Sequence, residues 1–163
     1  MRLLLIGGAL TLPACGGGRR LVTEVRASAD ANENSAVPVA LVVTNESELS
    51  RRLGEMSAEQ WFAFREQIQR DYPDEKTLFV AYWELVPGQE ALIVEHRVPR
   101  ARYAWVFADY EAQGEHRSAV PLRPALRVEL NQTGFEADPL SRRGRRELER
   151  ARAQGRDDKE DRR

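Results

Sequence analysis

Three side chains in this sequence could serve as a nucleophile, a general base or a soft metal ligand, namely Cys15, His96 and His116. His96 has the same strand parity as Leu92 and Val94, so we expect a half-buried, hydrogen-bonded imidazole. His116 follows a Gln-Gly turn and is expected in a loop. A hydrolase needs a nucleophile, a base and an orienting acid, and a structural zinc site needs four nitrogen or sulfur ligands. We therefore expect no catalytic residues, no metal and no cofactor.

Cys15 has a sequence context that indicates a defined reaction, the attachment of lipid. An apolar run at residues 3–10 has the length of a signal peptide and is shorter than the ~20 residues of a membrane-spanning helix. The Leu-Pro-Ala-Cys tetrapeptide at 12–15 then resembles a bacterial lipobox, in which the cysteine becomes the lipidated first residue of the mature protein. We expect a lipoprotein signal peptide at residues 1–14, lipidation of Cys15 and a short tether over residues 15–20.

The residue after this cysteine indicates the compartment. Gly16 stands where an Asp would favour retention at the inner membrane, so resemblance to the bacterial sorting pattern favours the outer membrane. Several acyl chains hold a protein stably on a bilayer, where a single chain would be marginal. The alternative interpretation of Cys15 is an unmodified thiol behind an ordinary export signal. We expect lipid anchoring in the bacterial outer membrane, with the folded domain on its periplasmic face.

Charge is distributed unevenly along the chain. The whole sequence has 25 Lys and Arg and 26 Asp and Glu, a net charge of −1 that gives no basic field for nucleic acid. Residues 15–137 have a net charge of −5, and residues 138–163 have a net charge of +3 with almost no apolar residues. We expect a domain over residues 21–137 and a charged tail over residues 138–163 that is disordered or partly helical. The tail's arginines could contact anionic lipid or another subunit, although such segments are more often simply solvated.

Period-2 alternation and short apolar runs predict six or seven strands within the domain. They lie near residues 21–27, 39–43, 78–83, 92–94, 102–110, 117–122 and 126–130. The continuous apolar run of the second strand indicates burial on both faces. This pattern predicts a mainly all-β fold, an antiparallel β-sandwich with one short helical insertion.

The helical insertion is marked by a Ser57–Gln60 capping-box spacing and ends at Tyr72. Trp61, Phe64 and Ile68 follow at helical spacing and are expected to face the sheet. Together with other aromatic residues they could line a ligand groove, but their spacing fits a packed core better. The full aromatic set is Trp61, Phe62, Phe64, Trp83, Tyr103, Trp105, Phe107 and Tyr110.

The order of these features resembles the TssJ family, the lipoproteins of type VI secretion. The resemblance rests on the lipobox, residues 27–32, 38–43 and 61–62, the Pro-Gly-Gln at 87–89, and residues 101–106 and 120–122. It implies a transthyretin-like β-sandwich without enzymatic activity, anchored in the outer membrane. It also implies docking on the periplasmic C-terminal domain of an inner-membrane TssM-type subunit.

In the TssJ family the loop between the first two strands is a main contact with the partner. Carried over to this sequence, the resemblance indicates the partner-binding residues Asp30, Asn32, Glu33, Asn34 and Ser35. Binding residues gather on loops that a rigid scaffold holds in place, although such a segment could also be a simple solvated connection. The second functional hypothesis is a periplasmic lipoprotein that binds a small molecule or a cell-wall fragment in an aromatic groove.

Overall fold

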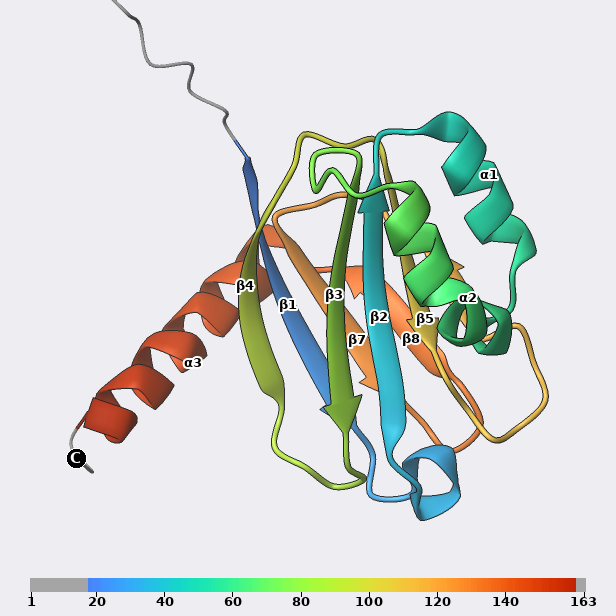
Figure 1. The fold of residues 1–163 in the computed structure, drawn as a ribbon. Helices are drawn as coiled ribbons and strands as arrows, with labels where there is room; N and C mark the ends of the chain where they lie inside the picture. Colours follow the sequence, from blue (N-terminus) through green and yellow to red (C-terminus); the bar gives the residue numbers. More distant parts are fainter. Residues whose placement is uncertain (1–17, 161–163) are drawn as a thin grey trace, which may run out of the picture.

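The computed structural model describes residues 18–160 and forms a β-sandwich of two four-stranded sheets (Figure 1). Sheet A has the strand order β4-β1-β7-β8, and sheet B has the order β3-β2-β5-β6. In chain order the strands are β1 (Arg19–Ala27), β2 (Val37–Thr44), β3 (Leu78–Leu85), β4 (Leu92–Val98), β5 (Tyr103–Ala108), β6 (Arg117–Ala119), β7 (Ala125–Leu130) and β8 (Phe135–Pro139). The prediction of a mainly β sandwich is confirmed.

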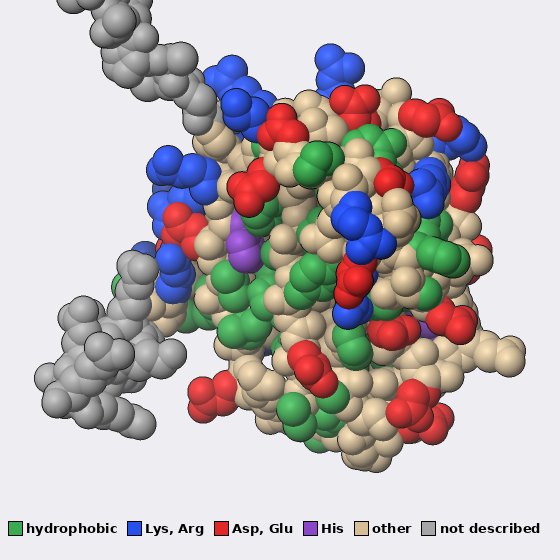
Figure 2. All heavy atoms as spheres, viewed as in Figure 1, with side chains coloured by type: hydrophobic (Ala, Val, Ile, Leu, Met, Phe, Trp, Pro, Cys, Tyr) green, Lys and Arg blue, Asp and Glu red, His purple; other side chains and the backbone are tan. Residues whose placement is uncertain are grey.

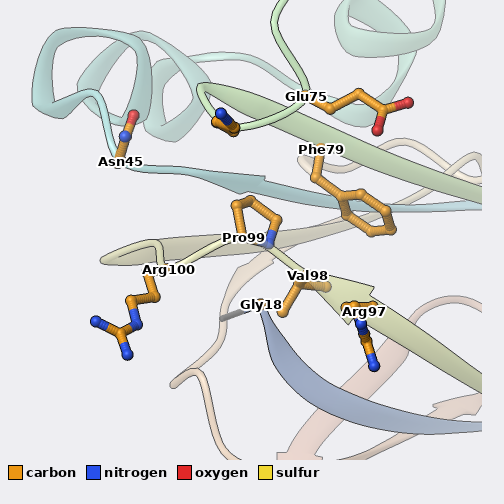
Figure 3. Close-up of a pocket in the computed structure, with 9 residues that line it drawn as sticks. Gly18, Asn45, Glu75, Phe79, Arg97, Val98, Pro99 and Arg100 are labelled. Atoms are coloured by element: carbon orange, nitrogen blue, oxygen red, sulfur yellow. The ribbon is translucent and has the colours of Figure 1, made fainter. Parts of the chain in front are cut away.

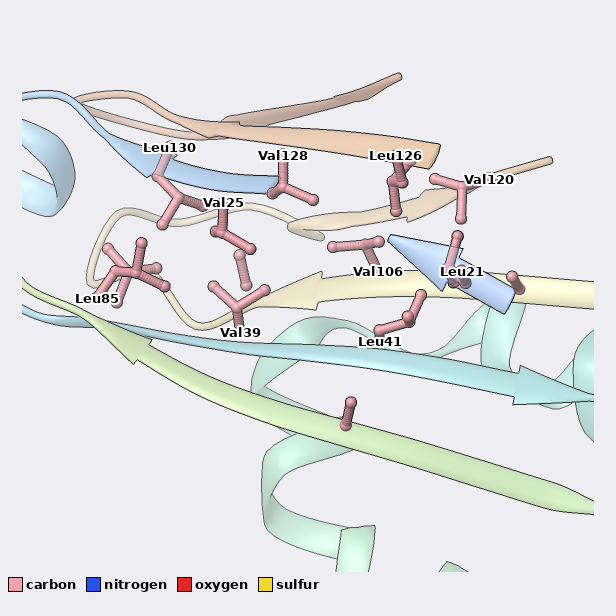
Figure 4. Packing of buried hydrophobic residues seen from close by; sticks show 14 of the residues in the cluster. Leu21, Val25, Val39, Leu41, Leu85, Val106, Val120, Leu126, Val128 and Leu130 are labelled. Atoms are coloured by element: carbon pink, nitrogen blue, oxygen red, sulfur yellow. The ribbon is translucent and has the colours of Figure 1, made fainter. Parts of the chain in front are cut away.

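Strand β2 shows why its apolar run is continuous. Val39 and Leu41 lie in the core between the two sheets, in one cluster with Val25 and Val128 of sheet A (Figure 4). Val42 belongs to a second cluster on the opposite face of sheet B, where helices cover the strands. Because successive side chains of a strand point to opposite faces, both sets of β2 residues must be apolar. The predicted burial on both faces is confirmed.

Sheet A contains one pairing that the sequence patterns did not indicate. Strand β1 lies between β4, its antiparallel partner, and β7, with which it pairs in parallel. Strand β8 then pairs with β7 at the sheet edge and continues to Pro139, past the predicted domain boundary at residue 137. The returning arm expected after the fifth strand is present as β6, which pairs with β5.

The insertion between β2 and β3 contains two helices where the sequence predicted one. These are α1 (Ser47–Glu55) and α2 (Ala58–Asp71), and they cover the outer face of sheet B (Figure 1). The predicted capping box is confirmed, since the Gln60 N–H donates to Ser57 Oγ at 3.2 Å and the Ser57 N–H donates to Gln60 Oε1 at 2.9 Å. The helix ends before Tyr72, as predicted. Within residues 18–160, no helix combines the length and apolar character needed to cross a bilayer.

The buried face of α2 differs from the predicted one at Phe64. Trp61 and Ile68 are fully buried, and Trp61 stacks on Phe107 of β5 with ring centroids 5.2 Å apart. Phe64 is 54% exposed. Three residues advance the helix by ~300°, so Phe64 lies at the margin of a face that Ala58, Trp61 and Ile68 define. The core interpretation therefore holds for Trp61 and Phe107 and is wrong for Phe64.

The segment after β8 forms a long helix, α3 (Arg142–Glu160). Leu148 is buried against Val22 and Ala125 on the outer face of sheet A. The sequence left disorder and partial helicity open for residues 138–163, and the structure shows a helix that is attached to sheet A by Leu148 and by an ion pair between Arg152 and Glu95 of β4.

Candidate functional site

Four loops gather at the end of the sandwich opposite to the point where residue 18 enters β1 (Figure 1). We call residues 28–36, 86–91, 109–116 and 131–134 the loop end. Backbone hydrogen bonds join these loops: the Gly88 N–H donates to the Ser28 carbonyl at 3.1 Å, and the Ser28 N–H donates to the Leu130 carbonyl at 2.9 Å. Gly88 has a φ of 71°, the left-handed conformation that glycine adopts readily in a tight turn. The loop end is thus one connected surface.

Asn32, one of the predicted contact residues, lies inside this surface. Its side chain is 2% exposed, and its Oδ1 accepts the Glu111 N–H at 2.8 Å while its Nδ2 donates to the Ala36 carbonyl at 3.1 Å. Its own N–H donates to the Asn131 carbonyl at 3.2 Å. Asn32 therefore fixes three of the four loops relative to one another, and its side chain faces away from solvent.

The backbone turns tightly around Asn32. Asn32, Glu33 and Asn34 have φ values of 47°, 53° and 70°, all in the left-handed region. This region costs a residue with an L side chain roughly 1–2 kcal/mol, with asparagine the most tolerant of those present. Such conformations persist where surrounding contacts determine them, and they cluster at functional sites. The turn directs the side chains of Glu33 and Asn34 into solvent.

The remaining predicted contact residues lie beside this turn. Asp30 is exposed, and its Oδ1 accepts the Ser28 hydroxyl at 2.7 Å. Ser35 is partly exposed, and its N–H donates to the Asn32 carbonyl at 2.8 Å. The structure thus brings all five predicted residues into one loop, with three side chains exposed, one partly exposed and one buried. Cys15, the predicted lipidation site, lies outside the described residues.

The loop end is acidic. Its four loops contain six carboxylates and no Lys or Arg. The six are Asp30, Glu33, Glu90, Asp109, Glu111 and Glu115. Burial raises the pKa of the Asp109 carboxyl, and the charge of Glu59 on α2 raises it further. Among residues 18–160, no group of three or more His, Cys, Asp or Glu is arranged to hold a metal ion. We therefore regard the carboxylates as a charged surface.

Tyr110 and His116 make contacts that hold the loops of the loop end together. The Tyr110 hydroxyl donates to the Gly134 carbonyl at 2.6 Å, and its ring stacks on His116 with centroids 4.9 Å apart. A ring nitrogen of His116 lies 2.8 Å from the Ala112 carbonyl. Burial raises the pKa of Tyr110 to about 12, partly opposed by a hydrogen bond from the Asn131 backbone. His116 lies in a loop, as predicted, and has a structural role there.

His96 packs between aromatic rings. Its ring centroid lies 5.6 Å from that of Phe79 and 5.5 Å from that of Trp83, both on β3. Its Nε2 is buried and has no hydrogen-bond partner among the described residues, so the expected hydrogen-bonded imidazole is a wrong prediction for this atom. Burial also lowers the pKa of His96. The ring fills space between the edge strands of the two sheets, a contact that the strand parity alone could not reveal.

A partly aromatic hollow of about 330 Å³ lies between α2 and β3. Phe62, Tyr82 and Trp83 line it, and the guanidinium of Arg65 lies over the rings of Phe62 and Tyr82 at 5.6 and 5.7 Å. Tyr82 is 40% exposed. These residues belong to the predicted aromatic set or adjoin it, so this hollow is where a groove of the second hypothesis would lie.

Comparison with known proteins relates this architecture to solved structures. Neither a family model nor a curated protein matches the sequence. Serratia marcescens Lip, described as a membrane bound component of the type VI secretion system, has a TM-score of 0.58 and 13% identity over 76% of this chain and 99% of its own. The lipoprotein TssJ1 from Pseudomonas aeruginosa has a TM-score of 0.56 and 18% identity, with the same coverage.

A further similar structure is described as the TssM C-terminal domain from EAEC, with a TM-score of 0.57 and 14% identity over 75% of this chain and 99% of that chain. At these identities the comparisons show a shared fold. The chain therefore has the β-sandwich fold of these type VI secretion components, as the sequence resemblance implied.

Proposed function

We propose that this chain is a structural lipoprotein of a type VI secretion membrane complex, anchored in the outer membrane and docking a TssM-type inner-membrane subunit through its loop end. The observation that carries this proposal is the position of residues 28–36, opposite the end where the chain leaves towards Cys15 (Figure 1). Strand β1 has nine residues and so spans ~30 Å. A domain tethered at Cys15 would present this loop towards the periplasm.

Exposed side chains of the loop end form the proposed contact. Asp30, Glu33 and Asn34 present polar groups to solvent, with Ser35 at the edge. Asn32 contributes indirectly, because it holds the loop in shape. The six carboxylates favour a basic docking face on the partner, and such complementarity sets specificity and association rate more than affinity.

The anchor is proposed on sequence grounds. Removal of residues 1–14 would leave Cys15 as the lipidated first residue, three positions from Gly18, where the described chain begins. Two proteins of similar fold support this assignment, one described as a membrane bound component and the other as a lipoprotein of type VI secretion. The same similarity supports a structural role in place of an enzymatic one.

The docking proposal is tested by measuring binding of the full chain to the periplasmic domain of the TssM-type subunit of the same organism. Asp30→Lys combined with Glu33→Lys should lower the association rate about tenfold at low salt, and the difference should shrink as salt rises. The matched control is Glu66→Lys with Asp71→Lys on α2, an equal charge change on exposed residues away from the loop end. Equal effects of the two double variants would overturn the assignment.

The aromatic hollow supports a second candidate function, binding of a small molecule or a cell-wall fragment. The exposed ring of Tyr82, beside the partly exposed rings of Phe62 and Trp83, suits a flat or sugar-like ligand. Titration of soluble peptidoglycan fragments, followed by the intrinsic tryptophan fluorescence of the chain, tests this candidate. A saturable fluorescence change that Tyr82→Ala abolishes would favour ligand binding. The absence of any fluorescence change would argue against ligand binding and in favour of the docking function.

A further inference from the structure

The end of the sandwich opposite to the loop end is basic. Six Lys and Arg side chains there are exposed, and none of them forms an ion pair with another described residue. They are Arg19, Lys76, Arg97, Arg100, Arg102 and Arg123. Glu46, Asp74 and Glu75 are the carboxylates on the loops of the same end. In Figure 2 the charged side chains at the lower end are red, whereas the upper end and the left margin show blue side chains together with red ones.

Hydrogen bonds and strand register show that these residues share one end of the fold. Arg19 faces Val98 in the sheet register and donates to the Leu122 carbonyl, next to Arg123. The Arg102 N–H donates to the carbonyl of Thr44, at the end of β2. The charges thus surround the site where the chain enters β1. We call this surface the basic end.

A hollow of about 470 Å³ opens at the basic end (Figure 3). Phe79, Val98 and Pro99 form its apolar wall, and Lys76, Arg97 and Arg100 supply positive charge around it, against the single carboxylate of Glu75. The hollow is therefore amphipathic, with an apolar wall beside three cations.

The entering chain touches this hollow. Gly18 lines it, and a Cβ at this position would lie 2.8 Å from Cγ of Arg97. From Cys15 to Gly18 the backbone can span at most ~11 Å. This reach is close to the Debye length of ~8 Å at physiological salt, so a lipid on Cys15 would hold the basic end within the electrostatic field of the membrane surface.

We propose that the basic end binds anionic phospholipid head groups of the membrane that carries the anchor. The head-group phosphate pairs with Arg97 or Arg100 at the rim of the hollow, and the adjoining part of the lipid lies against Phe79, Val98 and Pro99. Guanidinium groups pair well with phosphate oxygens, and basic residues beside a bilayer are attracted by its negative surface potential. The proposal rests on the lipid anchor of the proposed function. It adds a second contact that orients the domain, with the acidic loop end pointing away from the bilayer.

The test measures co-sedimentation of the unlipidated full chain, Cys15→Ser, with vesicles at about 0.1 M salt, where screening is still incomplete. One set of vesicles is phosphatidylcholine, and the other contains about one third phosphatidylglycerol. Binding should require phosphatidylglycerol and weaken as salt rises. Phosphatidylcholine vesicles report any contribution of the apolar run at residues 3–10, which does not depend on lipid charge. Equal binding to the two sets would overturn the proposal.

Variants locate the lipid contact. Arg97→Gln with Arg100→Gln should weaken binding to the anionic vesicles about thirtyfold, the loss expected from two basic residues near the surface. The control is Arg146→Gln with Arg150→Gln on the exposed side of α3, which should change binding less than about twofold. A larger loss in the α3 pair would place the lipid contact on α3 and overturn the proposal.

A second double variant at the basic end tests whether the head group binds in the hollow. Arg102→Gln with Arg123→Gln removes equal charge from residues that do not line the hollow. A clearly smaller loss than in the Arg97 and Arg100 pair supports a head group in the hollow, and an equal loss overturns that placement. Thermal unfolding confirms that each variant is folded. The vesicle experiments contain no protein partner, so their results do not depend on whether the loop end docks a TssM-type subunit.

Discussion

The Asn32 side-chain oxygen accepts the backbone N–H of Glu111 at 2.8 Å, and this hydrogen bond links the loop between β1 and β2 to the loop between β5 and β6. The Asn32 side-chain amide is buried, so this hydrogen bond stabilises the domain itself and is not available to a partner. The exposed carboxylates on either side of it, Glu33 and Glu111, are therefore positioned by a residue that a partner would not touch.

Replacing Asn32 with Ala should destabilise the domain and disorder the loop. Two side-chain hydrogen bonds are lost at ~1 kcal/mol each, and Ala in a left-handed conformation costs ~1 kcal/mol more, so we expect a decrease of about 2–3 kcal/mol in the free energy of unfolding. Urea denaturation measures this change. Asn32→Asp keeps the acceptor for the Glu111 N–H but places a buried carboxylate oxygen against the Ala36 carbonyl, so it should destabilise the domain at least as much as Asn32→Ala. A fully stable Ala variant would contradict the structural role.

Replacing Glu24 with Gln should also destabilise the domain. Glu24 is 2% exposed on β1, and it pairs with Arg127 at 2.6 Å and with Arg26 at 2.5 Å. A neutral side chain leaves two guanidinium groups without their shared carboxylate, which should cost about 2 kcal/mol because the arginines are only partly buried. Glu129→Gln removes an exposed partner 3.9 Å from Arg127 and should cost less than about 0.5 kcal/mol. Similar losses in both variants would argue against a special role for the buried carboxylate.

Replacing Leu148 with Ala tests whether α3 is part of the folded domain. The leucine is 4% exposed and packs against Val22 and Ala125, so its truncation should lower the free energy of unfolding by about 2–3 kcal/mol. Glu149→Ala on the exposed side of the helix serves as the control. If unfolding of the Leu148 variant matches that of the unchanged chain, α3 is energetically independent of the sandwich.

Tyr110 makes stability depend on alkaline pH. Burial raises its pKa to about 12, so the folded state holds the phenol proton more tightly than the unfolded chain, whose tyrosines titrate near ~10. This contribution is complete below pH ~10 and is lost as the pH rises towards ~12. Tyr110→Phe removes the hydrogen bond to Gly134, about 1 kcal/mol, and should also make the loss of stability between these pH values less steep. Parallel pH profiles for the two proteins would exclude this assignment.

Features set by local patterns could be predicted from the sequence. The capping box of Ser57 and Gln60, the turn at Gly88 and the two-sided burial of β2 all follow from residue types within a few positions of one another. Helix α1 was missed because Leu49 and Leu53 are its only buried apolar residues, too few to mark a period. Strand β8 was missed because its charged residues are held at an edge by pairing with β7.

The sequence could predict which segment contains the candidate site, but it could not predict which of its side chains are buried and which are exposed. The position of the loop between two strands follows from strand patterns, and the proposal that it binds a partner came from a family resemblance. The burial of Asn32 depends on Asn131 and Glu111, which reach it only after both sheets have formed. The acidic character of the whole surface likewise requires four loops from distant parts of the sequence to meet. Such contacts have no local signal.

The parallel pairing of β1 with β7 has a kinetic consequence. Val22 faces Ala125 in the register, so sheet A can be completed only when β1, the first described strand, pairs with β7, about a hundred residues later in the sequence. Pairings between residues so distant in sequence slow folding, because loop-closure entropy is lost before the contacts form. Strand β1 can pair with β4 as soon as residues 92–98 are available, but its other edge stays unpaired until residues 125–130 join sheet A. Until then the unpaired edge of β1 could pair with a strand of another chain, and chaperone binding to this edge would prevent such aggregation.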